Sequence, residues 1–360
     1  MRGSRAALAT FLVAATGSCG FNPTGGVVAD DVVDPDGGSE DDGGPGDGAC
    51  VDRCEGSTYH GCSGGQETST PCAAGCLDTP QPHCATLVPS NGANDSDLVD
   101  VTGELSVAAG QVVVVDTDDG GIVAYPSGGG AATTIRDPGN GLGDTMRFRV
   151  LAQINGAPAV AILGVRSLSI ADGGRLRITG DRPVLFLVST TATISGAIDV
   201  GAGHTGTIGQ NDCQECSGPG GGGGATNLVA ASGCAPGLNG NYYVTLDETG
   251  GGGGGFGFAG ARGGDSDTGS AVGGNITPIT ACSGASLVPL QGGAGGGRGS
   301  TSAALGAEVG GGGGGAVQIT ALVGITITAT ADIYAGGAGG AGSSDAYGGG
   351  GGGAGGGILL

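Results

Sequence analysis

The chain has no tryptophan and no lysine, and its 360 residues include only six phenylalanines and six tyrosines. A thick core needs large side chains, so this composition favours thin packing built from strands. A Walker A phosphate loop and a Schiff-base mechanism each require an ammonium group, so the absence of lysine excludes both.

Basic charge is also scarce. Twelve arginines face 33 carboxylates, which leaves a formal net charge of −21. A surface of this sign repels phosphate backbones, so the charge disfavours nucleic acid as a partner, and we expect none.

Glycine is abundant, with 88 residues in all. It forms runs at residues 220–224, 250–255, 310–315 and 348–353. No strict Gly-X-Y period is present, which excludes collagen. Two readings remain open: flexible excursions from a folded core, or a polyglycine-type bundle in which missing side chains let backbones approach closely.

The first 18 residues predict an export signal, with two arginines, an apolar run over 6–15 and small residues before Cys19. The run is too short to span a bilayer, which needs about 20 apolar residues. The small residues resemble a lipobox, which would place a lipid on Cys19 and tether the chain to a membrane. Thr16 departs from the usual lipobox pattern, so cleavage of the signal and release of the protein is the alternative. Eleven cysteines are an odd number, and lipidation of Cys19 would leave ten to pair.

Residues 19–49 predict a disordered acidic tether, rich in glycine, proline and carboxylates. Its "DPDGGSEDDGG" (34–44) has the alternating oxygens of a calcium loop but lacks the glutamate that usually closes one. We expect a solvated spacer and no cofactor, with Ca²⁺ as the weaker alternative.

Residues 50–85 predict a small disulfide-stapled module that contains a hairpin around "SGG" (63–65). Zinc binding is the alternative, but metal thiolates suit reducing compartments and this chain carries an export signal. If pairing is local, three cysteines on each side force at least one bridge between the halves. The six cysteines are Cys50, Cys54, Cys62, Cys72, Cys76 and Cys84.

Residues 86–360 predict an all-β fold, a parallel β-helix-like solenoid with a glycine-rich insert at about 202–315. Strand starts recur near 168, 176, 184 and 192, a spacing that also fits a small sandwich. A repeat favours the solenoid: "ISGAIDVGAG" (194–203) recurs as "ITATADIYAG" (327–336), which aligns Asp199 with Asp332. The chain ends at the threshold of a strand, which suggests a truncated last coil.

Four further cysteines lie in the glycine-rich insert, and two disulfides there would pin a long loop. The Cys-x2-Cys pair lacks the strand-to-helix context of a redox site and the second pair of a zinc ribbon. These cysteines are Cys213, Cys216, Cys234 and Cys282.

Catalytic motifs are weak. "DTGS" (267–270) has no second copy and no apolar strand before it, and "GCSGG" (61–65) falls on the hairpin turn. His204 is the only histidine outside the stapled module. No catalytic or metal-binding residue is therefore assigned.

Arginines gather between residues 147 and 182. In "RFRV" and "RLRI" strand alternation directs them outward, so they form either a solvated face or a docking strip for an anion. That anion is either an acidic polysaccharide or the chain's own acidic tether. The strip would contain Arg147, Arg149, Arg175 and Arg177.

The lipobox-like start, the acidic linker, "HCATLVPSNGA" (83–93) and the "GGGGGG…VQIT" rungs together resemble exported, glycine-rich, cysteine-containing lipoprotein-like proteins of myxobacterial type. The resemblance implies no particular activity. We expect an outer-membrane or cell-surface lipoprotein, or a secreted protein, that acts as a non-catalytic structural or adhesin-like component and contacts polysaccharide or other surface components. The alternative is a carbohydrate-active β-helix enzyme or a polysaccharide-binding protein.

Overall fold

The computed structural model describes ten stretches of the chain: 50–126, 128–203, 213–241, 248–267, 274–275, 277, 282, 286–300, 308–342 and 348–360. All of them belong to one compact unit, Ala49–Leu360. The predicted all-β class is confirmed, because the described helices are three short 3-10 turns: Ser90–Gly92, Asp95–Leu98 and Ile154–Gly156. Over the same stretches, no helix is long and apolar enough to cross a membrane.

The stapled module is a three-stranded antiparallel sheet followed by a two-stranded one. Its strands are β1 (Arg53–Glu55), β2 (Thr58–Ser63), β3 (Gln66–Pro71), β4 (Cys76–Leu77) and β5 (His83–Cys84). The predicted hairpin is the β2–β3 pair. Its two turn residues, Gly64 and Gly65, both have positive φ (61° and 76°), which is why glycine occupies them.

Three disulfides hold this module: Cys50–Cys62, Cys54–Cys76 and Cys72–Cys84. The second joins the two halves, as the parity of the cysteines requires. Covalent closure replaces a hydrophobic core here, because a module of this length buries too little apolar surface to fold alone.

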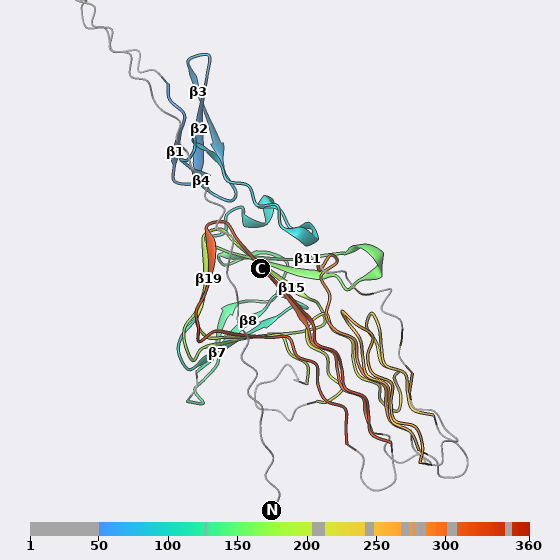
Figure 1. Cartoon of the computed structure of the whole chain (residues 1–360). Helices are drawn as coiled ribbons and strands as arrows, with labels where there is room; N and C mark the ends of the chain where they lie inside the picture. The colour runs from blue at the N-terminus through green and yellow to red at the C-terminus, as the bar shows by residue number, and fades with distance from the viewer. Residues whose placement is uncertain are drawn as a thin grey trace, which may run out of the picture. The chain divides into compact units, whose positions relative to one another are not determined.

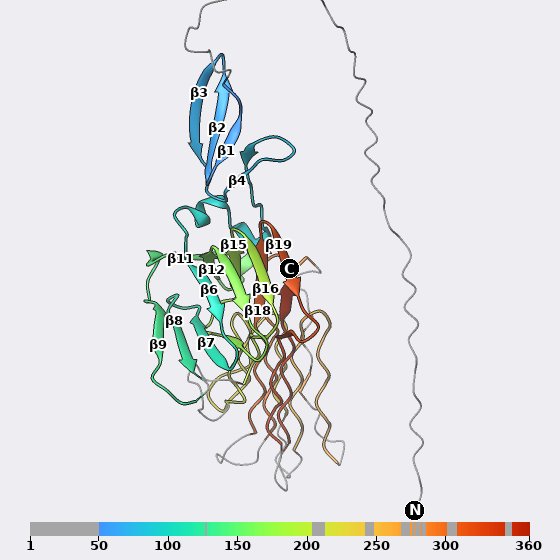
Figure 2. The ribbon, with the colours of Figure 1, turned by 90° about the vertical axis from the view of Figure 1, so that its left-hand side faces the viewer.

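Three successive strand triplets form the main body (Figures 1 and 2). The predicted strand starts near 168, 176, 184 and 192 are observed at 167, 175, 184 and 191. Each strand pairs in parallel with the equivalent strand of the next triplet. The triplets are β12 (Val160–Val165), β13 (Ser167–Ile170) and β14 (Arg175–Thr179); β15 (Val184–Val188), β16 (Thr191–Ile194) and β17 (Ala197–Asp199); and β18 (Ala316–Ala321), β19 (Gly324–Ile327) and β20 (Asp332–Tyr334).

The remaining strands extend the three resulting sheets, whose orders are β10-β11-β12-β15-β18-β21, β19-β16-β13-β6 and β20-β17-β14-β7-β8-β9. The last of these we call the Arg175 sheet. The added strands are β6 (Glu104–Val107), β7 (Gln111–Asp116), β8 (Ile122–Pro126), β9 (Thr133–Arg136), β10 (Gly141–Gly143), β11 (Met146–Leu151) and β21 (Gly357–Leu359).

The core lies between the three sheets, and alternate residues of each strand point into it. Strands β12 and β15 are buried along their whole length, because a second apolar cluster covers their other face. Leu98 and Leu290 belong to that cluster together with Ile162 and Leu185. Burial on both faces explains the uninterrupted apolar sequences of these strands.

The internal repeat is real, but its predicted alignment is wrong beyond the first strand. Ile194 pairs with Ile327 as expected, whereas Asp199 lies beside Tyr334 and Asp332 lies beside Ala197. The turn before β20 is two residues longer than the turn before β17, so a gapless alignment misplaces every later position.

The glycine-rich insert and the C-terminal region form a compact array of extended segments, which we call the glycine bundle (Figure 1). Its segments lie at 218–225, 235–241, 250–255, 260–264, 291–300, 308–315, 335–342 and 348–356. Their backbone hydrogen bonds repeat every three residues along a segment, as a three-residue-per-turn conformation requires. In the central segment the donors and acceptors are Gly310 to Ala225, Gly313 to Gly222, Gly311 to Gly351 and Gly314 to Ala354.

The bundle is too tight for side chains in its interior. A Cβ added to Gly313 would lie 2.0 Å from the carbonyl oxygen of Gly293, and one added to Gly353 would lie 2.0 Å from that of Gly312. In the described residues the oligoglycine runs therefore form a packed polyglycine-type bundle, and the alternative of flexible excursions does not hold there.

Candidate functional site

The four cysteines of the glycine-rich insert form two disulfides, Cys213–Cys216 and Cys234–Cys282. The second joins two bundle-associated stretches 48 residues apart. The export signal, Cys19, the acidic tether and His204 lie outside the described residues. Asp267 is exposed, and the rest of the "DTGS" motif is also outside them.

His60 of the stapled module lies in a charge cluster on the sheet surface. Its Nδ1 lies 2.6 Å from Oε1 of Glu67, and its Nε2 lies 3.5 Å from Oε2 of Glu55. Arg53 also donates to Glu67, and this hydrogen bond is the main reason why the pKa of the Glu67 carboxyl is lowered. In the part of the chain that the structure describes, no group of three or more His, Cys, Asp and Glu residues is placed to hold a metal ion.

The four arginines expected in one anion strip lie on two different sheets. Arg147 and Arg149 are on β11, whereas Arg175 and Arg177 are on β14. Alternation along each strand correctly predicts that they face away from the core, but it cannot predict which strands become neighbours. A single strip of four is therefore wrong.

The β11 pair anchors a neighbouring turn. Arg149 forms an ion pair with the buried Asp97, with its Nη2 2.7 Å from Oδ2, and this hydrogen bond raises the pKa of the guanidinium. Arg147 donates through Nη2 to the carbonyl oxygen of Val99 at 2.8 Å. Both bonds hold the turn that ends at Val99 against the sheet, so this pair has a structural role.

The β14 pair lies on the outer face of the Arg175 sheet, where strand register places polar side chains side by side. Arg175 is next to Ala197, which is next to Asp332, and one step along the strands Arg177 is next to Asp199, which is next to Tyr334. Arg175 forms an ion pair with Asp199 at 3.9 Å.

The same row is hollowed at Ala197. A pocket of about 230 Å³ is lined by Asp172, Arg175, Ala197, Thr330 and Asp332 together with neighbouring glycines. Tyr334 is 48% exposed and hydrogen-bonds to Asp332, which is the main cause of its raised pKa. The sequence showed Asp199 and Asp332 as a repeat, but the hollow between Arg175 and Asp332 depends on register across three strands.

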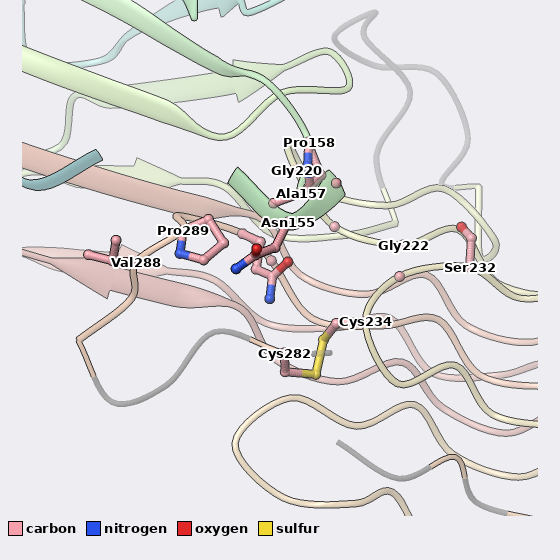
Figure 3. A pocket seen from close by; sticks show the side chains of 15 residues that line it. Asn155, Ala157, Pro158, Gly220, Gly222, Ser232, Cys234, Cys282, Val288 and Pro289 are labelled. Atoms are coloured by element: carbon pink, nitrogen blue, oxygen red, sulfur yellow. A yellow bond between two sulfur atoms is a disulfide. The ribbon is translucent and has the colours of Figure 1, made fainter. Parts of the chain in front are cut away.

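A larger cavity of about 630 Å³ lies where the strand body meets the glycine bundle (Figure 3). Asn155 and the Cys234–Cys282 disulfide are on its walls, and much of the remaining lining is glycine and proline. Asn155 has a φ of 59°, a left-handed conformation that asparagine tolerates. None of the lining residues is charged, so this lining offers backbone and amide groups for binding.

Sequence reasoning also missed the buried charge of Arg136, which is 1% exposed. Its guanidinium lies over the Phe148 ring, 5.5 Å from the centroid, and its burial lowers its pKa. It donates to five backbone carbonyl oxygens, those of Gly120, Asp137, Gly139, Gly141 and Met146. Arg136 therefore ties together the loops around β9 and β10.

No protein-family model, no curated protein and no solved structure matches the chain.

Proposed function

We propose that this chain is an exported cell-surface or extracellular-matrix protein, structural or adhesin-like, that presents a rigid surface and has no catalytic activity. In this proposal Cys19 carries the lipid, the acidic residues up to 49 act as the spacer, and the three strand triplets are coils of a three-sided β-helix. The glycine bundle is the observation that carries the structural role.

The bundle supports this role because its interior consists of peptide groups bonded to one another. A region built in this way offers few side chains for chemistry, but its many backbone hydrogen bonds make it stiff. The five disulfides support export, because all ten described cysteines are paired and disulfides persist in oxidising compartments.

The alternative, a carbohydrate-active enzyme, has one observation in its favour. Asp199 and Asp332 lie on adjacent strands of the Arg175 sheet, and paired carboxylates are what glycoside hydrolysis requires. Release of reducing ends from a polysaccharide by the purified protein would favour the enzyme over the structural role.

The compartment is tested by the intact mass of the full-length protein from the membrane fraction of a Gram-negative host, alkylated without reduction. We expect a lipid-sized addition at Cys19 and no alkylated thiol. The variant Cys19→Ser serves as the control and should appear without the lipid. Free thiols or an unprocessed N-terminus would overturn the proposal.

A further inference from the structure

We propose that the outer face of the Arg175 sheet is a binding site for a neutral glycan chain, with one sugar ring seated in the hollow between Arg175 and Asp332. This inference rests on the extracellular role proposed above and names a ligand class for it.

The hollow exists because a small residue separates two large polar ones. Ala197 pairs with Arg175 on one side and with Asp332 on the other. Since neighbouring strands lie about 4.8 Å apart, the backbones that carry the two charged residues are about 10 Å apart. Gly196, which also lines the hollow, cannot carry a side chain, because a Cβ there would lie 2.3 Å from the carbonyl oxygens of Ala171 and Gly174.

The walls of this hollow offer donors opposite acceptors. Arg175 is 52% exposed at its side chain, and its ion pair with Asp199 is longer than a hydrogen bond, which leaves guanidinium N–H groups for a ligand. Asp332, on the far wall, is an exposed acceptor. Vicinal hydroxyl groups of a sugar both donate and accept, so they match such a pair.

Arg177 adds a second donor on the same face. It lies two residues along β14 from Arg175 and is half-buried, so its guanidinium can donate to a ligand that lies along the strand.

The charges of the face favour a neutral ligand over an acidic one. Two arginines, Arg175 and Arg177, are interspersed with three carboxylates, Asp172, Asp199 and Asp332, so the face has no positive excess to attract an anion. Donors and acceptors that alternate without net positive charge suit hydroxyl groups.

Two tyrosines mark the extent of the face. Tyr334 on β20 is half exposed, and Tyr125 on β8 faces outward four strands away in the sheet order. Four strand spacings amount to about 19 Å, a span for an extended chain of several sugars and not for a single one. Each ring provides an apolar face on which a sugar can stack.

The test is isothermal titration of the purified full-length protein with cello-, laminari-, malto- and chito-oligosaccharides, and with oligogalacturonate as the acidic probe. We expect at least one neutral series to bind, with affinity that rises with chain length. Ala197→Leu, which fills the hollow, and Arg175→Gln, which removes the charged donor, should each raise its Kd about tenfold or more.

Matched controls lie away from the Arg175 sheet. Thr193→Leu places the same side chain on the exposed face of β16. Arg166→Gln removes an arginine of similar exposure, whose ion pair with Glu104 is also 3.9 Å long. Both should bind as the wild type does.

The proposal is overturned if no neutral oligosaccharide binds the wild type, if only oligogalacturonate binds, or if both Ala197→Leu and Arg175→Gln keep wild-type affinity. Circular dichroism of each variant separates lost binding from lost folding, and Arg175→Gln keeps the test decisive if Ala197→Leu does not fold. Failure here leaves the mass and lipidation result untouched, so it is distinguishable from failure of the surface role.

Discussion

Replacing one glycine in the interior of the glycine bundle should be far more damaging than replacing one on its outside. At Gly313 an added Cβ would meet the Gly293 carbonyl oxygen at 2.0 Å, whereas at Gly339 it would meet nothing within 4 Å. Neither residue has a positive φ, so alanine is conformationally acceptable at both. The pair Gly313→Ala and Gly339→Ala therefore isolates packing from backbone preference.

The magnitude follows from the hydrogen bonds that must break. The segments need to separate by more than 1 Å to reach an ordinary contact of about 3.4 Å. That shift disrupts the bonds from Gly313 to Gly222 and from Gly293 to Gly314, both 2.8 Å long. At about 1.5 kcal/mol for each bond the loss is about 3 kcal/mol. Alanine also lowers the conformational entropy of the unfolded chain, which stabilises the folded protein by under about 1 kcal/mol. The net destabilisation at Gly313 is therefore about 2 kcal/mol.

Gly339→Ala breaks no hydrogen bond and only lowers the entropy of the unfolded chain, so it should stabilise the protein by under about 1 kcal/mol. The assay is native-state hydrogen exchange, read by mass spectrometry on peptides from residues 218–225 and 291–300. Gly313→Ala should accelerate exchange in these peptides about thirtyfold, since about 2 kcal/mol corresponds to that factor. Equal exchange in the two variants would refute the packed bundle.

Three further predictions concern the strand body and the stapled module. Arg136→Lys keeps the charge, but lysine has three N–H donors for the five carbonyl acceptors that Arg136 binds. In a denaturant titration it should lower the free energy of unfolding by about 3 kcal/mol. A decrease no larger than that caused by Arg166→Lys would contradict this. Removing the bridge between the module halves with Cys54→Ser and Cys76→Ser should cost about 3 kcal/mol and expose residues 50–85 to limited proteolysis, while unchanged cleavage would count against the stapling role. Burial raises the pKa of the Asp116 carboxyl in the folded protein, so the folded state loses stability as the pH rises from the ordinary aspartate pKa through the raised one. Asp116→Asn should therefore melt at a higher temperature than the wild type at neutral pH. This difference should shrink below the ordinary aspartate pKa, where the carboxyl is protonated in both states.

Local patterns predicted the strands well, because each depends on neighbours in the sequence. Alternation in "RLRI" places Leu176 and Ile178 in the core and Arg175 and Arg177 outside, as observed. Cysteine parity likewise predicted a bridge between the two halves of the module. The longer turn before β20, and with it the pairing of Asp199 with Tyr334, could not be predicted from local patterns, because strand register is decided by pairing between distant segments and not by residue type.

The sequence by itself determined the all-β class, the inward and outward sides of the strands, and the even grouping of the ten described cysteines. Only the tertiary structure decided that Arg147 and Arg175 lie on different sheets, that Ala197 forms a hollow beside Arg175, and that the oligoglycine runs are packed. Each of these depends on segments far apart in the chain. Glycine, which has no side chain, is equally compatible with a flexible loop and a tight bundle until a neighbouring backbone lies against it.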